Sequence, residues 1–246
     1  MAPGKAPRKG TIMKTIKVIT KALNGVIDTG LIILFLLFLL IGAYIMADTL
    51  YIYSGASQRG ALTYKPDSGG EDVGVLKELS EDCIGWITVD GTNIDYPLMQ
   101  GRTNAEYLNT DPFGEYSLSG SIFLDCNNRS SFEDPYSVIY GHHMEGNVMF
   151  GVLDKYLSEE FFEARRTGRI TLSDGTVCEL RIFAVLPCSA RDTEIFDIRE
   201  KGPGESFLTD HALYLKDYGN GKIVALTTCY GAGSEDRLAV LAELIR

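Results

Sequence analysis

Residues 29–47 form an uninterrupted apolar segment, and this segment constrains the architecture more than any other feature of the sequence. The segment reads TGLIILFLLFLLIGAYIMA and contains no charged side chain. As a helix it would match the hydrocarbon thickness of a bilayer, about 30 Å. A buried core helix, the alternative, normally shows a polar stripe, and none is present here. We therefore expect residues 29–47 to span a membrane.

The flanking sequence predicts how this segment is oriented. Residues 1–28 carry six basic side chains and one acid, Asp28. The positive-inside rule therefore places this tail in the cytoplasm and the rest of the chain outside the cell. A cleaved signal peptide would have an apolar core of about 7–15 residues and a small-x-small cleavage site. The run here is longer and ends in GAYIMAD, without a clear A-x-A, which favours an uncleaved, single-pass anchor in the cell membrane.

The charge and cysteine content exclude several functions for the remaining residues. Subtracting residues 1–28 from totals of 23 basic and 33 acidic side chains leaves 17 basic and 32 acidic ones. So acidic a body is a poor partner for nucleic acid, because phosphate contacts need clustered lysine and arginine. The five cysteines form no CxxC pair or Cys/His cluster that would suggest zinc. We expect no metal site and no cofactor. They lie at positions 83, 126, 178, 188 and 229.

Beyond the apolar segment, the sequence predicts a stalk and one domain. Residues 48–71 are rich in glycine, serine and tyrosine and contain the breaker PDSGG, so we expect an extracytoplasmic stalk. Residues 72–246 then form a single domain, which opens with a short helix over 72–82. Helical periodicity recurs at 148–164 and is expected at 204–217.

Strand patterns dominate this domain. About eight short runs of β-branched and apolar residues are separated by turn signals such as Asp90-Gly91 and Ser173-Asp174-Gly175. With helices only as insertions, the pattern predicts a mainly β fold, a closed or nearly closed barrel. The predicted strands are 84–89, 93–97, 119–124, 136–140, 169–172, 177–186, 222–229 and 237–244.

Histidine candidates for acid–base chemistry are few. His142 and His143 follow the predicted strand 136–140 and therefore project from a rigid edge into a loop, where functional residues are often found. His211 lies within LTDHAL and is typical of an ordinary surface or packing residue of a helix. Taken alone, the histidine pair is more typical of an ordinary polar loop.

Cys229 changes this balance because of its position. It ends the predicted strand 222–229, and a glycine-rich loop then leads to Arg237 at the start of the last strand. A thiolate can attack a carbonyl, a histidine can protonate the leaving amine, and an arginine can stabilise the oxyanion. An isolated cysteine is more often a packing residue, and the other four cysteines fit that interpretation better. Cys229, a histidine and Arg237 together form a complete set for acyl transfer.

These residues resemble a known family. Residues 226–229 (LTTC) followed by Arg237 resemble the TLxTC…R signature of sortases, and residues 140–144 (YGHHM) resemble the strand carrying their catalytic histidine. The resemblance covers about residues 72–246. Four further stretches resemble the class B branch: 85–97 (GWITVDGTNIDYP), 104–108 (NAEYL), 119–125 (SGSIFLD), and 141–144 (GHHM) followed by 149–150 (MF).

The resemblance implies a fold and a catalytic set. The fold would be the eight-stranded sortase barrel with inserted helices, an extra N-terminal helix and a long helix between the sixth and seventh strands. Cys229 would be the nucleophile and Arg237 the oxyanion- and substrate-binding residue. His142 would be the acid/base, because the histidine of the family directly follows the glycine, and His143 would be its neighbour.

The resemblance also implies a set of substrate contacts. The matching positions line the groove for the sorting signal in similar enzymes, and the backbone N–H of Tyr230 would be the second oxyanion donor. The residues implied to bind substrate are Tyr140, Thr227, Asn104, Leu108 and Tyr230.

The reaction implied is transpeptidation. Similar enzymes cleave a C-terminal sorting motif of surface proteins after its threonine, often NPxTN-like in class B, and hold the product as a thioester. An amine of a peptidoglycan precursor or cross-bridge then resolves it, without a metal. The sequence departs from some relatives in one respect, because no aspartate directly follows Cys229. Glu235 and Asp236 are nearby, and we expect them to be solvated loop charges.

Three alternatives stay open at this point. A pilin-polymerising sortase would use a lysine amine, although residues 48–70 contain no lid motif such as Asp-Pro-aromatic. A cysteine hydrolase would release the peptide to water. A membrane-tethered binding module on a degenerate barrel would be expected to lack Cys229, His142 or Arg237, and all three are present.

Overall fold

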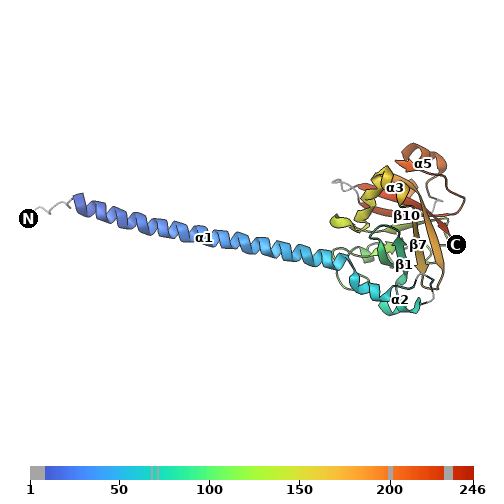
Figure 1. Cartoon of the computed structure of the whole chain (residues 1–246), viewed down its shortest axis with the longest axis horizontal. Coiled ribbons are helices and arrows are strands. Elements are labelled where there is room, and N and C mark those ends of the chain that lie inside the picture. Colours follow the sequence, from blue (N-terminus) through green and yellow to red (C-terminus); the bar gives the residue numbers. More distant parts are fainter. Residues whose placement is uncertain (1–8, 68, 71, 199–201, 230–234) are drawn as a thin grey trace, which may run out of the picture. The chain divides into compact units, whose positions relative to one another are not determined.

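The computed structural model describes residues 9–67, 69–70, 72–198, 202–229 and 235–246 (Figure 1). The chain divides into two compact units, Met1–Tyr51 and Ile52–Arg246. The first unit consists of most of α1, the helix Lys9–Ala56, and the second contains the last residues of α1 and the whole sheet.

Helix α1 contains the predicted membrane segment. It is the one helix of the described residues that is long and apolar enough to cross a bilayer, with a mean hydropathy of 2.8 in its most apolar window, none of which is buried in the protein. The helix continues past residue 47 to Ala56. Residues 48–56, expected to belong to a stalk, are therefore helical, because no glycine interrupts the pattern before Gly55.

The second unit is built on a closed barrel, so the predicted eight-stranded fold is confirmed. Within the described chain, eight strands follow the order β11-β10-β4-β3-β2-β1-β7-β8, and pairing between β11 and β8 closes the sheet. Short β9 adds to β8, and β5 and β6 form a separate hairpin. The strands are β1 Cys83–Val89, β2 Asp95–Met99, β3 Ile122–Leu124, β4 Tyr136–Tyr140, β5 His143–Met144, β6 Val148–Met149, β7 Thr167–Leu172, β8 Val177–Ser189, β9 Tyr214–Leu215, β10 Lys222–Cys229 and β11 Asp236–Ile245.

Alternation along each strand explains the core. In β10, Val224 and Leu226 enter the barrel core, whereas Ile223 and Ala225 face a second apolar cluster on the outer side. Because successive side chains point to opposite faces, a strand buried on both faces is a continuous apolar run. This double burial fixes the course of β10, whose last residue is Cys229.

The inserted helices pack against the apolar clusters of the barrel, and two predicted helical segments differ from expectation. The segment 148–164 forms β6, η4 and α3 rather than one helix, and 204–217 is helical only over α5, with β9 after it. In the described residues, two short helices, α4 and α5, stand where the resemblance implied one long helix. The helices are η1 Arg59–Tyr64, α2 Gly74–Leu79, η2 Glu106–Leu108, η3 Glu145–Asn147, η4 Phe150–Leu157, α3 Glu159–Ala164, α4 Thr193–Phe196 and α5 Glu205–His211.

The folded unit begins earlier than residue 72. Ala56 is fully buried in the barrel core, and Ala61 is fully buried in the cluster under α2. The side-chain amide of Gln58 donates to the carbonyl of Gly120 at 2.9 Å. Part of the predicted stalk therefore packs on the barrel, although its role as a spacer stays a prediction.

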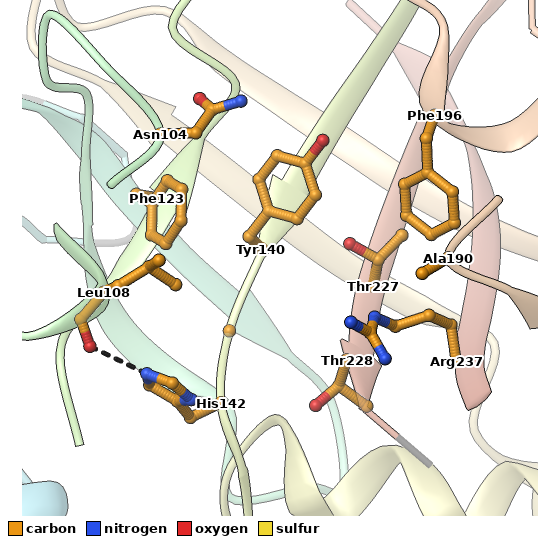
Figure 2. A pocket seen from close by; sticks show the side chains of 11 residues that line it. Asn104, Leu108, Phe123, Tyr140, His142, Ala190, Phe196, Thr227, Thr228 and Arg237 are labelled. Atoms are coloured by element: carbon orange, nitrogen blue, oxygen red, sulfur yellow. Dashed lines mark hydrogen bonds between the residues drawn. The ribbon is translucent and has the colours of Figure 1, made fainter. Parts of the chain in front are cut away.

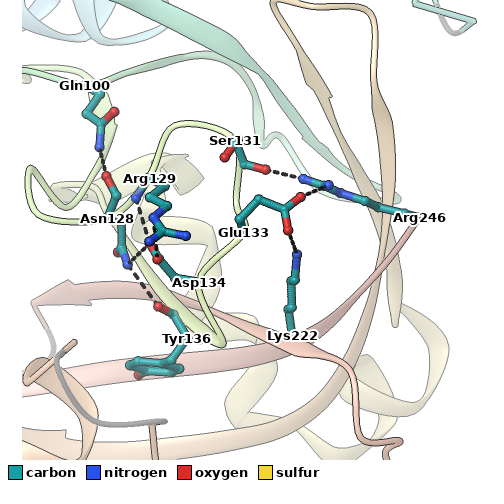
Figure 3. Close-up of polar contacts among 9 residues, drawn as sticks. All are labelled: Gln100, Asn128, Arg129, Ser131, Glu133, Asp134, Tyr136, Lys222 and Arg246. Atoms are coloured by element: carbon teal, nitrogen blue, oxygen red, sulfur yellow. Dashed lines mark hydrogen bonds and ion pairs between the residues drawn. The ribbon is translucent and has the colours of Figure 1, made fainter.

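A polar cluster fixes the strand ends that lie far from Cys229. Figure 3 shows Glu133 accepting from Lys222, at the start of β10, and from Arg246, directly after β11. Arg246 also donates to the carbonyl of Ser131. Strand β10, which ends at Cys229, and strand β11, which contains Arg237 near its start, are thus also held at the ends far from these residues.

Candidate active site

The pairing of three strands brings the predicted catalytic residues to one edge of the barrel. Strand β10 pairs antiparallel with β11, so that Cys229 is opposite Arg237. It pairs parallel with β4, so that Thr227 is opposite Tyr140. His142 follows Tyr140 by two residues, as Cys229 follows Thr227. The predicted nucleophile, base and arginine therefore stand at neighbouring strand ends, while Tyr230 lies outside the described residues.

A cavity of about 380 Å³ lies at this edge (Figure 2). It unites six of the predicted site residues, which come from four separate parts of the chain. Its wall is largely aromatic and aliphatic, with a few polar groups, as is typical of a binding site. The lining residues are Asn104, Leu108, Phe123, Tyr140, Gly141, His142, Ala190, Phe196, Thr227, Thr228 and Arg237.

His142 is oriented by the backbone of the β2–β3 connection. Its Nε2 donates to the carbonyl of Leu108 at 2.7 Å, the contact drawn in Figure 2. Because a carbonyl only accepts, Nε2 carries the proton in this bond. Nδ1 is then the ring nitrogen left to accept a proton. Leu108 thus contributes its backbone to the predicted base as well as a side chain to the cavity wall.

The two other histidines have different surroundings. His143 Nε2 contacts Asp154 Oδ2 at 2.7 Å, so its ring belongs to the β5–η4 region rather than to the cavity. His211 bonds to the carbonyl of Phe207 at 2.9 Å and stacks on that ring, 4.3 Å between centroids. His211 therefore packs on its own helix, as the sequence indicated.

Gly141 permits the close packing beneath His142. A β-carbon at this position would lie 2.5 Å from Ile122 Cδ1 and 2.7 Å from the Phe150 ring. The Gly141 N–H also donates to the Thr227 carbonyl at 3.2 Å, which extends the β4–β10 pairing. The chain can therefore pass over the barrel core to His142 only without a side chain here.

We expect Gly141→Ala to lower stability by about 1–3 kcal/mol, the range for overpacking a core. The displaced backbone would move His142, and a shift of about 1 Å can cost about 100-fold in rate. Peptide cleavage and thermal unfolding would be measured for Gly141→Ala and for a control variant. Gly74→Ala is the matched control, because a β-carbon at Gly74 meets no atom within 4 Å. Equal effects of the two changes would contradict this account.

Burial makes two other cysteines, Cys83 and Cys188, poor candidates for the nucleophile. Burial raises the pKa of Cys83 to about 11 and that of Cys188 to about 12. Cys188 is opposite Arg237 across the β8–β11 pairing, and the charge of Arg237 only partly offsets the effect of burial on this pKa. Both thiols therefore stay protonated at neutral pH and are poor nucleophiles.

Several lining residues were not anticipated from the sequence. Phe123 and Phe196 flank Tyr140, with ring centroids 5.3 Å and 6.5 Å from it. Phe123 lies within the quoted SGSIFLD stretch and Thr228 within LTTC, so their neighbourhood was signalled although their roles were not. Phe196 and Ala190 come from the β8–β9 connection, for which the sequence carries no signal.

The β8–β9 connection is tied to the start of β11. The N–H of Ala190 donates to the carbonyl of Glu235 at 2.7 Å, and Arg191 forms an ion pair with the Glu235 carboxylate. Arg237 Nη1 donates to the carbonyl of Asp236 at 2.9 Å. The wall formed by Ala190 and Phe196 is thus anchored beside Arg237.

A closed β-barrel that brings a cysteine, a histidine and an arginine to adjacent strand ends is the arrangement expected of a thiol-dependent acyl-transfer enzyme. The sortase-domain family model matches residues 87–245, which include all three residues. The chain belongs to the sortase family and is a sortase-type cysteine transpeptidase.

Individual relatives place it in the class B branch. It is 32% identical over 184 residues to sortase B of Staphylococcus aureus, covering 70% of this chain and 73% of that protein. The structure is similar to a class B sortase of Streptococcus pyogenes involved in pilus biogenesis, at 34% identity and a TM-score of 0.65, covering 72% of this chain and 100% of that one. It is also similar to a substrate complex of S. aureus sortase B, at 28% identity and a TM-score of 0.62, covering 71% and 84% of the chains.

Proposed function

We propose that this enzyme cleaves an NPxTN-like C-terminal sorting signal of surface proteins after its threonine and transfers the acyl group to a cell-wall amine. The observation that carries the proposal is the cavity in which His142, Arg237 and the groove residues meet beside the end of β10. The similar S. aureus sortase B, whose structure contains a substrate, supports the assignment of a peptide to this cavity.

In the first half-reaction, the thiolate of Cys229 attacks the carbonyl carbon of the threonine. Arg237 and the backbone N–H of Tyr230 stabilise the oxyanion. His142 donates a proton to the departing amine, the C–N bond breaks, and a thioester remains on Cys229.

In the second half-reaction, an amine attacks the thioester. His142 now accepts the proton of that amine, a new amide bond forms, and the thiolate leaves. The reaction is a balanced exchange of one amine for another, and it needs neither redox chemistry nor a metal.

The cavity wall suits the middle of such a signal. Leu108, Phe123 and Phe196 offer apolar surface to a proline and to the methyl group of a threonine, and Tyr140 adds an aromatic face with a polar tip. Asn104 and Thr227 provide polar contacts at the same wall. This combination favours a short extended peptide over a charged small molecule.

The anchor fits this reaction. With residues 29–47 in the bilayer and residues 1–28 in the cytoplasm, the catalytic domain, 72–246 together with the packed residues from 52 on, lies outside the cell. Anchored precursor proteins and lipid-linked peptidoglycan precursors lie at the same membrane face. The partners proposed are therefore surface proteins with a sorting signal and a peptidoglycan precursor or cross-bridge amine.

A pilin lysine is the second candidate amine. The S. pyogenes relative involved in pilus biogenesis shares the fold at 34% identity, which favours this alternative over plain hydrolysis. The chemistry at Cys229 is the same in both cases, and only the nucleophile of the second step differs.

The test uses the full chain in detergent micelles with a quenched NPQTN peptide. Triglycine, a pilin-type lysine peptide or no amine is added, and the products are identified by mass. A threonine–triglycine amide would support cell-wall anchoring, and an isopeptide with lysine would support polymerisation. Release of the free acid only, at every amine concentration, would contradict transpeptidation of this signal.

A further inference from the structure

Asp125 is a buried carboxylate that the acyl-transfer scheme does not use. It directly follows β3 and is only 4% exposed. Burying a charged group is unfavourable unless it is paired or hydrogen-bonded. The hydrogen bonds of this buried aspartate, which lies beside the active-site wall, must therefore offset the cost of its burial.

Four donors converge on the Asp125 carboxylate. Oδ2 accepts from Asn104 Nδ2 at 2.7 Å and from Tyr140 Oη at 3.0 Å. Oδ1 accepts from the backbone N–H and the side-chain amide of Asn127, at 2.9 and 3.0 Å. The Asn127 contacts hold the carboxylate in place, and the other two hold residues that line the cavity. Asp125 thus connects the β2–β3 connection to the end of β4 at the substrate groove.

These bonds determine whether Tyr140 and Asn104 can donate a hydrogen bond to a ligand or accept one from it. Tyr140 has a single hydroxyl proton, and Asp125 takes it, so the Tyr140 oxygen can only accept from a ligand. Asn104 Oδ1 accepts from the Cys126 N–H at 2.7 Å, and one Nδ2 hydrogen goes to Asp125, so the second Nδ2 hydrogen is its remaining donor. Of these two wall residues, Tyr140 therefore offers an acceptor to a ligand and Asn104 offers a donor.

The phenol also stays neutral. Burial raises the pKa of Tyr140 well above its ordinary value, and the charge of Asp125 and the bond to it raise this pKa further. Tyr140 therefore keeps its proton at physiological pH, and the acceptor it presents is an uncharged oxygen.

We propose that Asp125 is a positioning residue that sets the hydrogen-bonding polarity of the groove through Tyr140 and Asn104. The matching ligand group is an amide of the sorting signal, which carries an N–H donor for Tyr140 and a C=O acceptor for Asn104. This inference rests on the proposed function, because it concerns recognition of the same peptide. Asp125 does not touch the reacting atoms, so it acts on peptide binding more than on the chemical steps.

The first test compares Asp125→Asn with Asp134→Asn in the full chain. Asp134 lies in the same loop and accepts from the Arg129 N–H at 2.7 Å, but it has no contact with Tyr140 or Asn104 among the described contacts. An asparagine at 125 has only one acceptor oxygen, so it cannot accept from Asn127 on one side and from Tyr140 and Asn104 on the other, and the arrangement that the carboxylate holds is lost. We expect KM for the peptide to rise at least about tenfold, the usual effect of losing a charged hydrogen bond, with kcat changed less than about threefold. An unchanged KM, or an equal effect of Asp134→Asn, would overturn the proposal.

The second test asks whether Asp125 acts through its two partners. In the background Asn104→Ala with Tyr140→Phe, Asp125→Asn should change KM less than about threefold, and additive effects would contradict the proposal. Should Asp125→Asn fail to fold, Tyr140→Phe and Asn104→Ala decide, since each should raise KM by itself. Should the wild type cleave no sorting peptide, the proposed function fails; the Asp125–Tyr140 link is then judged by whether the two substitutions shift Tm non-additively.

Discussion

Replacing Cys229 by alanine is expected to abolish both peptide cleavage and ligation. Without the thiol no thioester can form, and loss of a covalent nucleophile lowers kcat by at least about 10⁴-fold in comparable enzymes. The full chain would be incubated with the sorting peptide in the absence of amine, and the acyl-enzyme would be detected by intact mass. We expect a mass increase equal to the acyl fragment in the wild type and none in Cys229→Ala.

Cys188→Ala is the matched control for this experiment. Cys188 is opposite Arg237 on β8, just as Cys229 is opposite Arg237 on β10. Burial keeps the pKa of Cys188 at about 12, so its loss should leave the acyl-enzyme and the rate within a few-fold of the wild type. Retained acylation in Cys229→Ala, or its loss in Cys188→Ala, would reassign the nucleophile.

Much of this site was predictable because its motifs lie at the ends of apolar runs that form strands. The motif LTTC ends an apolar run, and YGHHM follows another, so both were expected at strand termini. Such runs form strands because they can be buried on both faces, and the barrel buries β10 in this way. The pairing of Cys229 with Arg237 then follows from the short loop between two antiparallel strands.

Features that depend on tertiary contacts were not predictable. The helix expected over 204–217 stops at His211, because the following backbone pairs with β8: Leu213 N–H donates to Val185, and Lys216 N–H to Phe183, both at 2.8 Å. The segment 204–217 has a helical pattern, but the open edge of β8 offers its last residues another set of hydrogen bonds. Local propensity is a weak guide where such an edge is available.

The start of the folded unit was not predictable because the residues buried there are small. Ala56 and Ala61 are fully buried, yet alanine gives almost no periodic signal in a stretch rich in glycine, serine and tyrosine. Phe196 was missed for a related reason, since it lines the cavity from a connection whose path is set by ties such as the Arg191–Glu235 ion pair. Neither contact leaves a pattern in the neighbouring sequence.

The second large effect is expected at His142. His142→Gln keeps an amide N–H that can donate to the Leu108 carbonyl, as Nε2 does, but it cannot exchange a proton at neutral pH. Losing general acid–base catalysis costs about 10²–10⁴-fold, so we expect kcat/KM of His142→Gln to fall by that factor. Although glutamine preserves the contact that orients the side chain, it cannot transfer a proton, so His142→Gln should be about as inactive as His142→Ala. Cleavage of the quenched peptide at pH 7 would be measured for both variants.

His143→Gln is the control that distinguishes the two adjacent histidines. It makes the same chemical change one residue away, where Nε2 contacts Asp154 instead of facing the cavity. Loss of the His143–Asp154 contact should weaken the β5–η4 region but leave kcat/KM within about tenfold of the wild type. The reason is that a partly exposed pair contributes about 1 kcal/mol or less to stability. A larger loss in His143→Gln than in His142→Gln would transfer the acid/base role to His143. Recovery of activity in His142→Gln relative to His142→Ala would instead show that the Leu108 contact, rather than proton transfer, is what the reaction requires of this side chain.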